Sequence, residues 1–170
     1  MTVLKPKAVI GVDPGDSGAI CLVADEPSMI PIFYPTTMHL LEMVEVYRAW
    51  QHQYDIRMVV VEDVHAIPGA AAGTSFKFGA NTERMAVVPA TLGLPVGRIK
   101  VKEWQKIMDI SVSRNLKGAS RKKAIKTKVA EVVKNQFPTA SINGPKGGLL
   151  DGRSDALAIA EASRRKFSLF

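Results

Sequence analysis

The chain has 170 residues, of which 46% are hydrophobic, and this length and composition suit one domain with a sizeable core. Its formal net charge is +7, and no apolar run approaches the ~20 residues that a membrane-spanning helix needs, so we expect no contact with a membrane. The single Cys21 excludes an internal disulfide and any zinc site built from cysteines.

Two features of the first residues fit a reducing, cytoplasmic setting. The segment 1–7 leads straight into an apolar run, so a secretory signal is not expected. Cys21 lies within the apolar run 19–23 and is most simply a small core residue.

Apolar runs separated by turns predict four strands and two helices in the first half of the chain. The expected strands are 7–13, 18–24, 29–34 and 56–62, and the expected helices are 38–53 and 75–88. Pro31 makes the third run an edge or irregular strand. The unbroken β-branched character of the fourth suits a parallel strand covered on both faces. The second helix should end near Pro89.

The second half of the chain predicts one short strand and three helices. The strand is expected at 96–101 and the helices at 102–110, 121–137 and 151–165. Ser120 is a good N-cap for the middle helix, whose apolar residues recur at helical spacing. Antiparallel strands first and alternating strands and helices later predict an α/β fold, with a mixed sheet and helices on both faces.

Four carboxylates stand where a metal ion could use them. Asp13 and Glu62 each close a buried strand, whereas Asp151 and Asp155 open the last helix. A spacing of four puts these two aspartates on one helix face, and the small Ala158 further along would let that face approach the sheet. Buried carboxylates are costly without a partner, and hard cations such as Mg²⁺ take oxygen ligands. The pattern therefore predicts one divalent-metal site.

Plainer roles are open for some of these residues. Asp13 is also a common turn residue, although Gly15 and Gly18 would let the backbone approach a ligand closely. Asp151 suits either metal ligation or capping of the last helix. Asp155 lies one turn inside and faces an apolar side, which favours ligation over a simple interaction with the helix dipole.

Positive charge is concentrated between Arg98 and Lys134. This stretch contains twelve Lys or Arg residues and three acidic residues. The basic region and the acidic residues are separated along the chain. This separation suits a protein whose basic region binds a polyanion and whose acidic residues build a metal site. A solvated basic surface that aids solubility is the plainer interpretation.

Three segments resemble the signature segments of RuvC-type Holliday junction resolvases, in the RNase H-like superfamily. They are Gly11-Val12-Asp13-Pro14-Gly15, Val60-Val61-Glu62 and Ser154-Asp155-Ala156-Leu157-Ala158-Ile159-Ala160, of which the last is the most specific. Their order and spacing match, and the resemblance covers nearly the whole chain. It implies one RNase H-like nuclease domain over 1–170 with a mixed five-stranded sheet. Short, divergent members of this kind are familiar from phage genomes.

The resemblance also implies a function, a structure-selective DNA endonuclease that resolves four-way junctions by paired symmetric nicks. Its partners would be branched DNA and a second copy of the chain, in the cytoplasm (of the host, if the gene is viral), with no small-molecule cofactor. Hydrolysis would use two Mg²⁺ ions, with Mn²⁺ able to substitute. Asp13 would bridge both ions, Glu62 would complete the site of one, and Asp151 with Asp155 the site of the other.

One position departs from the family pattern. Many members place an acidic or histidine ligand three residues before the final aspartate, where this chain has Gly152 and carries its carboxylate at Asp151 instead. Both spacings share a helix face with Asp155, so the chemistry can survive.

Candidate DNA contacts follow from the same resemblance. The family carries lysines ahead of and within the penultimate helix, and Lys102 and Lys122 fall nearest to those positions. Lys122 would stabilise transition-state charge or, as we favour, contact a flanking phosphate. An aromatic that contacts junction bases corresponds to His65, otherwise a surface residue, or Phe76, otherwise a packing residue. The basic side chains expected at phosphates are Lys102, Arg121, Lys122, Lys123 and Lys126.

Two other functions compete with junction resolution. One is a nuclease of the same fold that acts on flaps, forks or RNA-containing substrates. The other is a non-catalytic binding module, which four acidic residues argue against because a binder does not need them. An actin-like phosphotransferase is a distant further alternative, since the chain is too short for two lobes.

Overall fold

The computed structural model describes residues 4–26, 28–64 and 71–170, and one five-stranded sheet forms its centre. Its strands are β1 (Lys7–Val12), β2 (Ala19–Ala24), β3 (Ile32–Pro35), β4 (Asp55–Asp63) and β5 (Val96–Lys100), in the order β3-β2-β1-β4-β5. The pairs β1–β2 and β2–β3 are antiparallel, whereas β1–β4 and β4–β5 are parallel. The prediction of a mixed five-stranded sheet is confirmed, and β3 is an edge strand as predicted, although it begins at Ile32, after Pro31.

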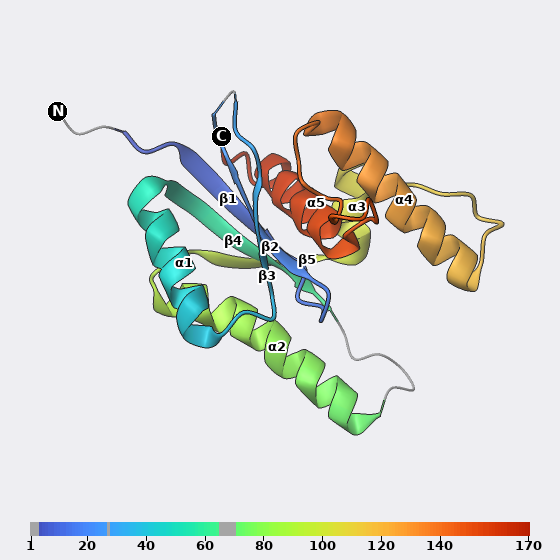
Figure 1. Ribbon diagram of the computed structural model, residues 1–170, viewed down its shortest axis with the longest axis horizontal. Coiled ribbons are helices and arrows are strands. Elements are labelled where there is room, and N and C mark those ends of the chain that lie inside the picture. The colour runs from blue at the N-terminus through green and yellow to red at the C-terminus, as the bar shows by residue number, and fades with distance from the viewer. Residues whose placement is uncertain (1–3, 27, 65–70) are drawn as a thin grey trace.

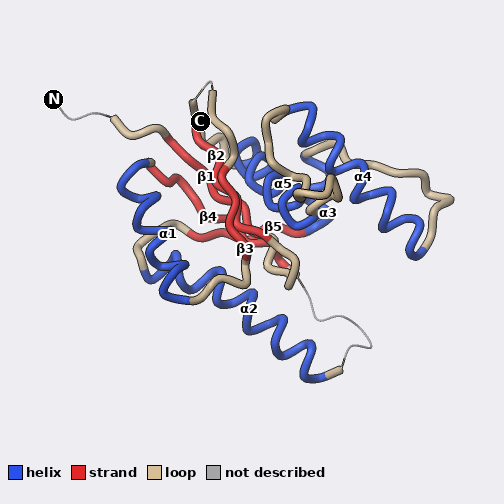
Figure 2. Tube along the Cα trace, in the orientation of Figure 1, coloured by secondary structure: helices blue, strands red, loops and turns tan. Residues whose placement is uncertain are grey.

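Helices cover both faces of this sheet, as Figures 1 and 2 show. One face carries α1 (Leu40–Gln53) and α2 (Ala72–Thr91), and the other carries α3 (Val101–Ile107), α4 (Gly118–Gln136) and α5 (Asp151–Lys166). The core is accordingly divided into two apolar clusters, with Tyr47 and Met85 in one and Trp104 and Leu157 in the other. The α/β class predicted from the chain order is confirmed.

The innermost helix is α5. Every residue from Ala156 to Ala160 is fully buried, because this stretch packs against β1 and β2 on one side and against α3 and α4 on the other. Its alanines let the helix backbone come close to the sheet, as the small-residue pattern predicted. The observed start at Asp151 agrees with the expected one.

Two predicted boundaries are wrong. The helix expected from 121 begins at Gly118, with Lys117 as its N-cap, so Ser120 lies inside α4 and caps nothing. Gly118 enters the helix with a φ of 52°, a conformation that glycine adopts without steric cost. The helix expected from 75 begins earlier, at Ala72, and ends at Thr91, near Pro89 as expected, because a proline in the last turn removes one backbone donor only.

In the described part of the chain, no helix combines the length and the apolar character that crossing a bilayer would require.

Candidate active site

Two parallel strands end side by side at one edge of the sheet. β1 and β4 pair with Val12 opposite Val61, so the next residues, Asp13 and Glu62, stand at neighbouring carboxyl ends. Glu62 is 9% exposed and Asp13 is half-buried. The backbone N–H of Gly15 donates to Oδ1 of Asp13 at 3.1 Å, which fixes this carboxylate over its own turn.

The first turn of α5 rests on the turn that follows β1. Gly152 and Gly18 form a parallel bridge, and a Cβ at Gly152 would lie 2.1 Å from the carbonyl oxygen of Ser17. Further along the helix, a Cβ at Gly11 would lie 2.3 Å from the carbonyl oxygen of Ala156. Side chains cannot occupy such gaps, so glycine is what permits the helix to sit this close.

This contact accounts for the glycine at position 152. An acidic side chain at position 152 would collide with the turn backbone. The carboxylate is carried one residue earlier, by Asp151. This residue is still near the other acidic groups, since its charge raises the pKa of both Asp13 and Asp155.

The four carboxylates form one electrostatic neighbourhood. Burial, together with the charges of Asp13, Glu62 and Asp151, raises the pKa of Asp155 to about 8. Burial also raises the pKa of Glu62 to about 7, with Asp13 adding to the increase. The pKa of Asp13 is raised by burial too, against the lowering effect of the Gly15 hydrogen bond. Ionising all four groups is therefore unfavourable without additional positive charge.

Asp151 does not cap its helix. The N-cap of α5 is Leu150, which offers no side-chain cap, and Asp151 is the first helical residue. Its Oδ2 instead accepts a hydrogen bond from Nζ of Lys126, so the capping alternative is wrong. The pKa of Lys126 is raised by this bond and by the charges of Asp155 and Asp13. Lys126 is thus the lysine of α4 that faces the acidic cluster.

The donor set suits a hard divalent cation. All four groups are carboxylates, which are the ligands that Mg²⁺ and Mn²⁺ prefer, and burial with mutual repulsion raises the pKa of Glu62 and Asp155. Within the described ranges, no three Asp, Glu, His or Cys side chains converge closely enough to enclose one ion. The carboxylates are therefore neighbours that an ion would draw together, with Lys126 as the positive charge already present.

Two buried contacts that support the site escape sequence reasoning. The indole N–H of Trp104 in α3 donates to Oε1 of Glu62 at 2.7 Å, across 42 positions of sequence. The only signal for it in the sequence is that a buried tryptophan needs an acceptor for its N–H.

The second contact is a brace from α2. Asn81 donates to the carbonyl of Pro14 at 2.6 Å, and Thr36 donates to the carbonyl of Gly15 at 2.8 Å. Arg84 donates to the carbonyl of Thr36 at 2.5 Å and to Oδ1 of Asn81 at 2.8 Å. The turn after Asp13 is thus held from α2 while α5 presses on it from the other face of the sheet.

Four of the predicted DNA-binding cations lie on the first turns of α4, namely Arg121, Lys122, Lys123 and Lys126, and the fifth, Lys102, lies on α3. Lys122 and Lys123 are exposed on α4, Arg121 is half-buried and donates to the carbonyl of Ser113, and Lys102 is exposed on α3. Phe76 is 78% exposed on α2, so its alternative role as a packing residue is wrong. His65 lies outside the described residues.

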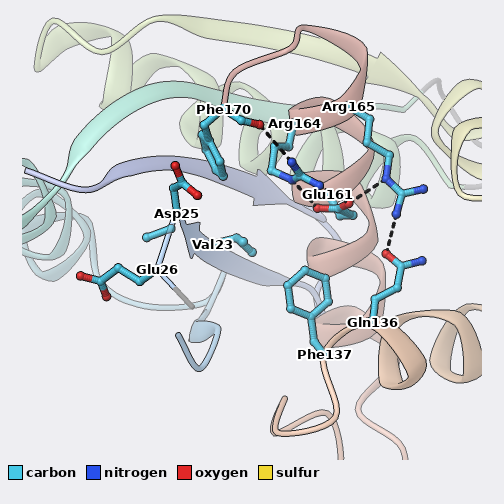
Figure 3. Close-up of a pocket in the computed structure, with 10 residues that line it drawn as sticks. Val23, Asp25, Glu26, Gln136, Phe137, Glu161, Arg164, Arg165 and Phe170 are labelled. Carbon is cyan, nitrogen blue, oxygen red and sulfur yellow. Dashed lines mark hydrogen bonds and ion pairs between the residues drawn. The ribbon is translucent and has the colours of Figure 1, made fainter. Parts of the chain in front are cut away.

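A cavity of about 450 Å³ lies at the other end of α5, and Figure 3 shows its lining. Its charged centre is Glu161, whose two oxygens accept from Arg164 and Arg165 at 2.7 to 2.8 Å. Arg165 also donates to Gln136 at the end of α4. These hydrogen bonds satisfy the Glu161 carboxylate and fasten α5 to α4, and the cavity lining contains none of the four carboxylates of the site.

Comparison by sequence finds no matching family model and no matching curated protein. Comparison by structure finds RuvC of Thermus thermophilus, both alone and in a complex with a Holliday junction substrate. The TM-scores are 0.58 and 0.59, the identity is 18% in each case, and the match covers 95% of this chain and 97% of the other. The yeast mitochondrial Holliday junction resolvase Ydc2 matches with a TM-score of 0.50 and 12% identity, over 99% of this chain and 82% of that one. The chain therefore shares the fold of these solved Holliday junction resolvases.

Proposed function

We propose that this chain is a metal-dependent DNA endonuclease that cuts branched DNA, and that its substrate is the four-way junction. The observation that carries the proposal is that Asp13, Glu62, Asp151 and Asp155 are electrostatic neighbours at one edge of a fold shared with junction resolvases. A domain that only binds DNA would not need to keep mutually repelling carboxylates in a half-buried site.

In this proposal, the four carboxylates hold two Mg²⁺ ions, or Mn²⁺ in their place. When bound, the ions supply charge neutralisation at the scissile phosphate and a water of lowered pKa. Asp13 and Glu62 enter from strand ends and Asp151 and Asp155 from one helix, so the ligands come from rigid elements.

Lys126 is the residue we assign to charge at the reacting phosphate. It lies against the acidic cluster through Asp151, whereas Lys122 is exposed on α4 and makes no ion pair with any described residue. A cation held beside the site stabilises developing negative charge. With Lys126 in that role, Lys122 is the better candidate for a contact with a flanking phosphate.

Exposed cations around the site would bind the DNA backbone. Lys102 on α3 and Lys122 and Lys123 on α4 make no ion pair with any described residue, so their charge is available to phosphates. Several such contacts give strong, salt-sensitive binding that does not depend on sequence. Selection of a junction would then rest on shape.

A homodimer would supply the two symmetric sites that paired nicks require. α2 offers Val87, which is 53% exposed, and Phe76 near its start, whereas Met85 and Val88 belong to the core. A cytoplasmic location and a phage origin remain expectations from the resemblance.

Cleavage of a synthetic mobile four-way junction with Mg²⁺, mapped on all four strands, tests this function. We expect paired symmetric nicks that disappear in Asp13→Asn. Asp16→Asn is the matched control, because Asp16 lies three residues away in the same turn and is exposed. Equal cutting of flaps, forks or RNA–DNA hybrids would support the broader nuclease alternative. Activity that survives Asp13→Asn would refute the metal-site assignment.

A further inference from the structure

Glu62 is held by a residue outside the acidic cluster. Trp104 is 2% exposed, and its indole N–H donates to Oε1 of Glu62 at 2.7 Å. We propose that Trp104 is a positioning residue, which fixes one carboxylate oxygen of Glu62 and leaves the other as the one available to a cation. This inference rests on the proposed function, because it gives Glu62 the role of a metal ligand.

The fold places Trp104 over the end of β4 with little freedom. β5 pairs with β4 so that Ile99 lies opposite Glu62, and α3 begins directly where β5 ends. Trp104 then comes within the first turns of α3 and packs in the same buried cluster as Ile99 and Leu157. A buried ring of this size cannot shift without leaving a void, so its N–H is a fixed donor.

Glu62 needs such a donor more than the other acidic residues do. A glutamate has one more rotatable bond than an aspartate and loses more rotamer freedom when it is fixed. Asp13 is already held by the N–H of Gly15, and Asp151 by Lys126. Trp104 supplies the corresponding restraint for Glu62, in the way that outer partners orient carboxylate ligands at metal sites.

A purely structural role is the alternative. A buried tryptophan requires an acceptor, and Glu62 is the one it finds. In that case, removing the donor would affect stability and leave metal affinity unchanged. Metal binding measured without DNA therefore separates the two roles.

The experiment compares Mn²⁺ binding by calorimetry for wild type, Trp104→Phe and a protein with 3-benzothienylalanine at position 104. The last replaces the N–H by sulfur at nearly constant volume, so it keeps the test valid if Trp104→Phe unfolds. Trp50→Phe is the matched control, because Trp50 is 4% exposed, packs edge-on against Tyr34 and Tyr47, and belongs to the other apolar cluster of the core. Loss of the donor should weaken Mn²⁺ binding by about 10- to 100-fold, while the control binds like wild type.

A spectroscopic readout accompanies the affinity. In Trp50→Phe, Trp104 is the only tryptophan, and its emission should change over the Mn²⁺ concentrations that fill the site. Glu62→Gln in the same background should remove the change. Unaltered Mn²⁺ affinity in both proteins that lack the donor would overturn the positioning role and leave the proposed function intact. Failure of wild type to bind Mn²⁺ would overturn the proposed function, and this inference with it.

Discussion

Replacing Gly11 by alanine tests how closely α5 must lie on β1 for the acidic residues to meet. The new Cβ would lie 2.3 Å from the carbonyl oxygen of Ala156 and 2.4 Å from the backbone nitrogen of Ala160, where ordinary contacts begin at 3.4 Å. Both obstacles are backbone atoms, so no side-chain rotation relieves them. The helix must move away from the strand by about 1 Å, and a misplacement of this size can cost about 100-fold in rate.

The stability cost follows from the same clash. Overpacking a rigid core costs about 1–3 kcal/mol, and a backbone obstacle puts Gly11→Ala at the upper end. For a chain of this length, 3 kcal/mol corresponds to a fall in Tm of about 6–12 °C. Urea unfolding and thermal melts measure this change. Single-turnover cleavage of a four-way junction well below the Tm measures the rate.

Gly79→Ala is the matched control. A Cβ at Gly79, within α2, would meet nothing within 4 Å. Alanine there should leave cleavage unchanged and stabilise the helix by about 0.5–1 kcal/mol. A Gly11→Ala protein with the Tm and cleavage rate of wild type would refute the argument that this glycine sets the distance between α5 and β1.

Three further predictions concern the charges of the site. The pKa of Asp155 is raised to about 8 and that of Glu62 to about 7, so between pH 4 and these values the native state binds more protons than the unfolded state. The urea midpoint in EDTA should therefore fall as the pH rises from about 4 and level off above about 8, and a midpoint that rises with pH over this range would contradict this. Asp155→Asn should gain about 1–2 kcal/mol at pH 8 while losing cleavage. Mn²⁺ affinity should increase over the same pH range, because the ion displaces the protons, and calorimetry at several pH values checks it. Lys126→Ala should lower the cleavage rate at saturating junction by about 100-fold. Lys122→Ala should instead weaken junction binding and reduce its salt slope by about 1, as fluorescence anisotropy can measure, and equal effects of the two substitutions would argue against separate roles.

The ends of the buried strands were predictable because they are local features. Asp13 and Glu62 each follow an apolar run, and the register of β1 with β4 sets them side by side. Asp155 was predictable because helical spacing gives it a face. The proximity of Asp13 to Glu62 could be inferred because neighbouring parallel strands end at one edge of a sheet.

Contacts between distant segments were not predictable in the same way. Trp104 and Glu62 are 42 positions apart, and Asn81 and Pro14 are 67 positions apart. Neither pair follows from periodicity, because each depends on how whole elements are stacked. Lys126 was expected among the phosphate contacts, and its position beside Asp151 follows from the packing of α4 on α5, which no pattern within either helix reveals.

Position 152, at the start of the last helix, contacts the turn 14–18, which lies more than a hundred residues earlier in the sequence. Since the carbonyl of Ser17 occupies the space where a side chain would stand, the identity of residue 152 and the shape of the turn 14–18 are not independent. Homologous chains that carry an acid or histidine at this position should also have a rebuilt turn after the first strand. Such paired variation would mark distant relatives that an overall identity of 18% leaves hidden.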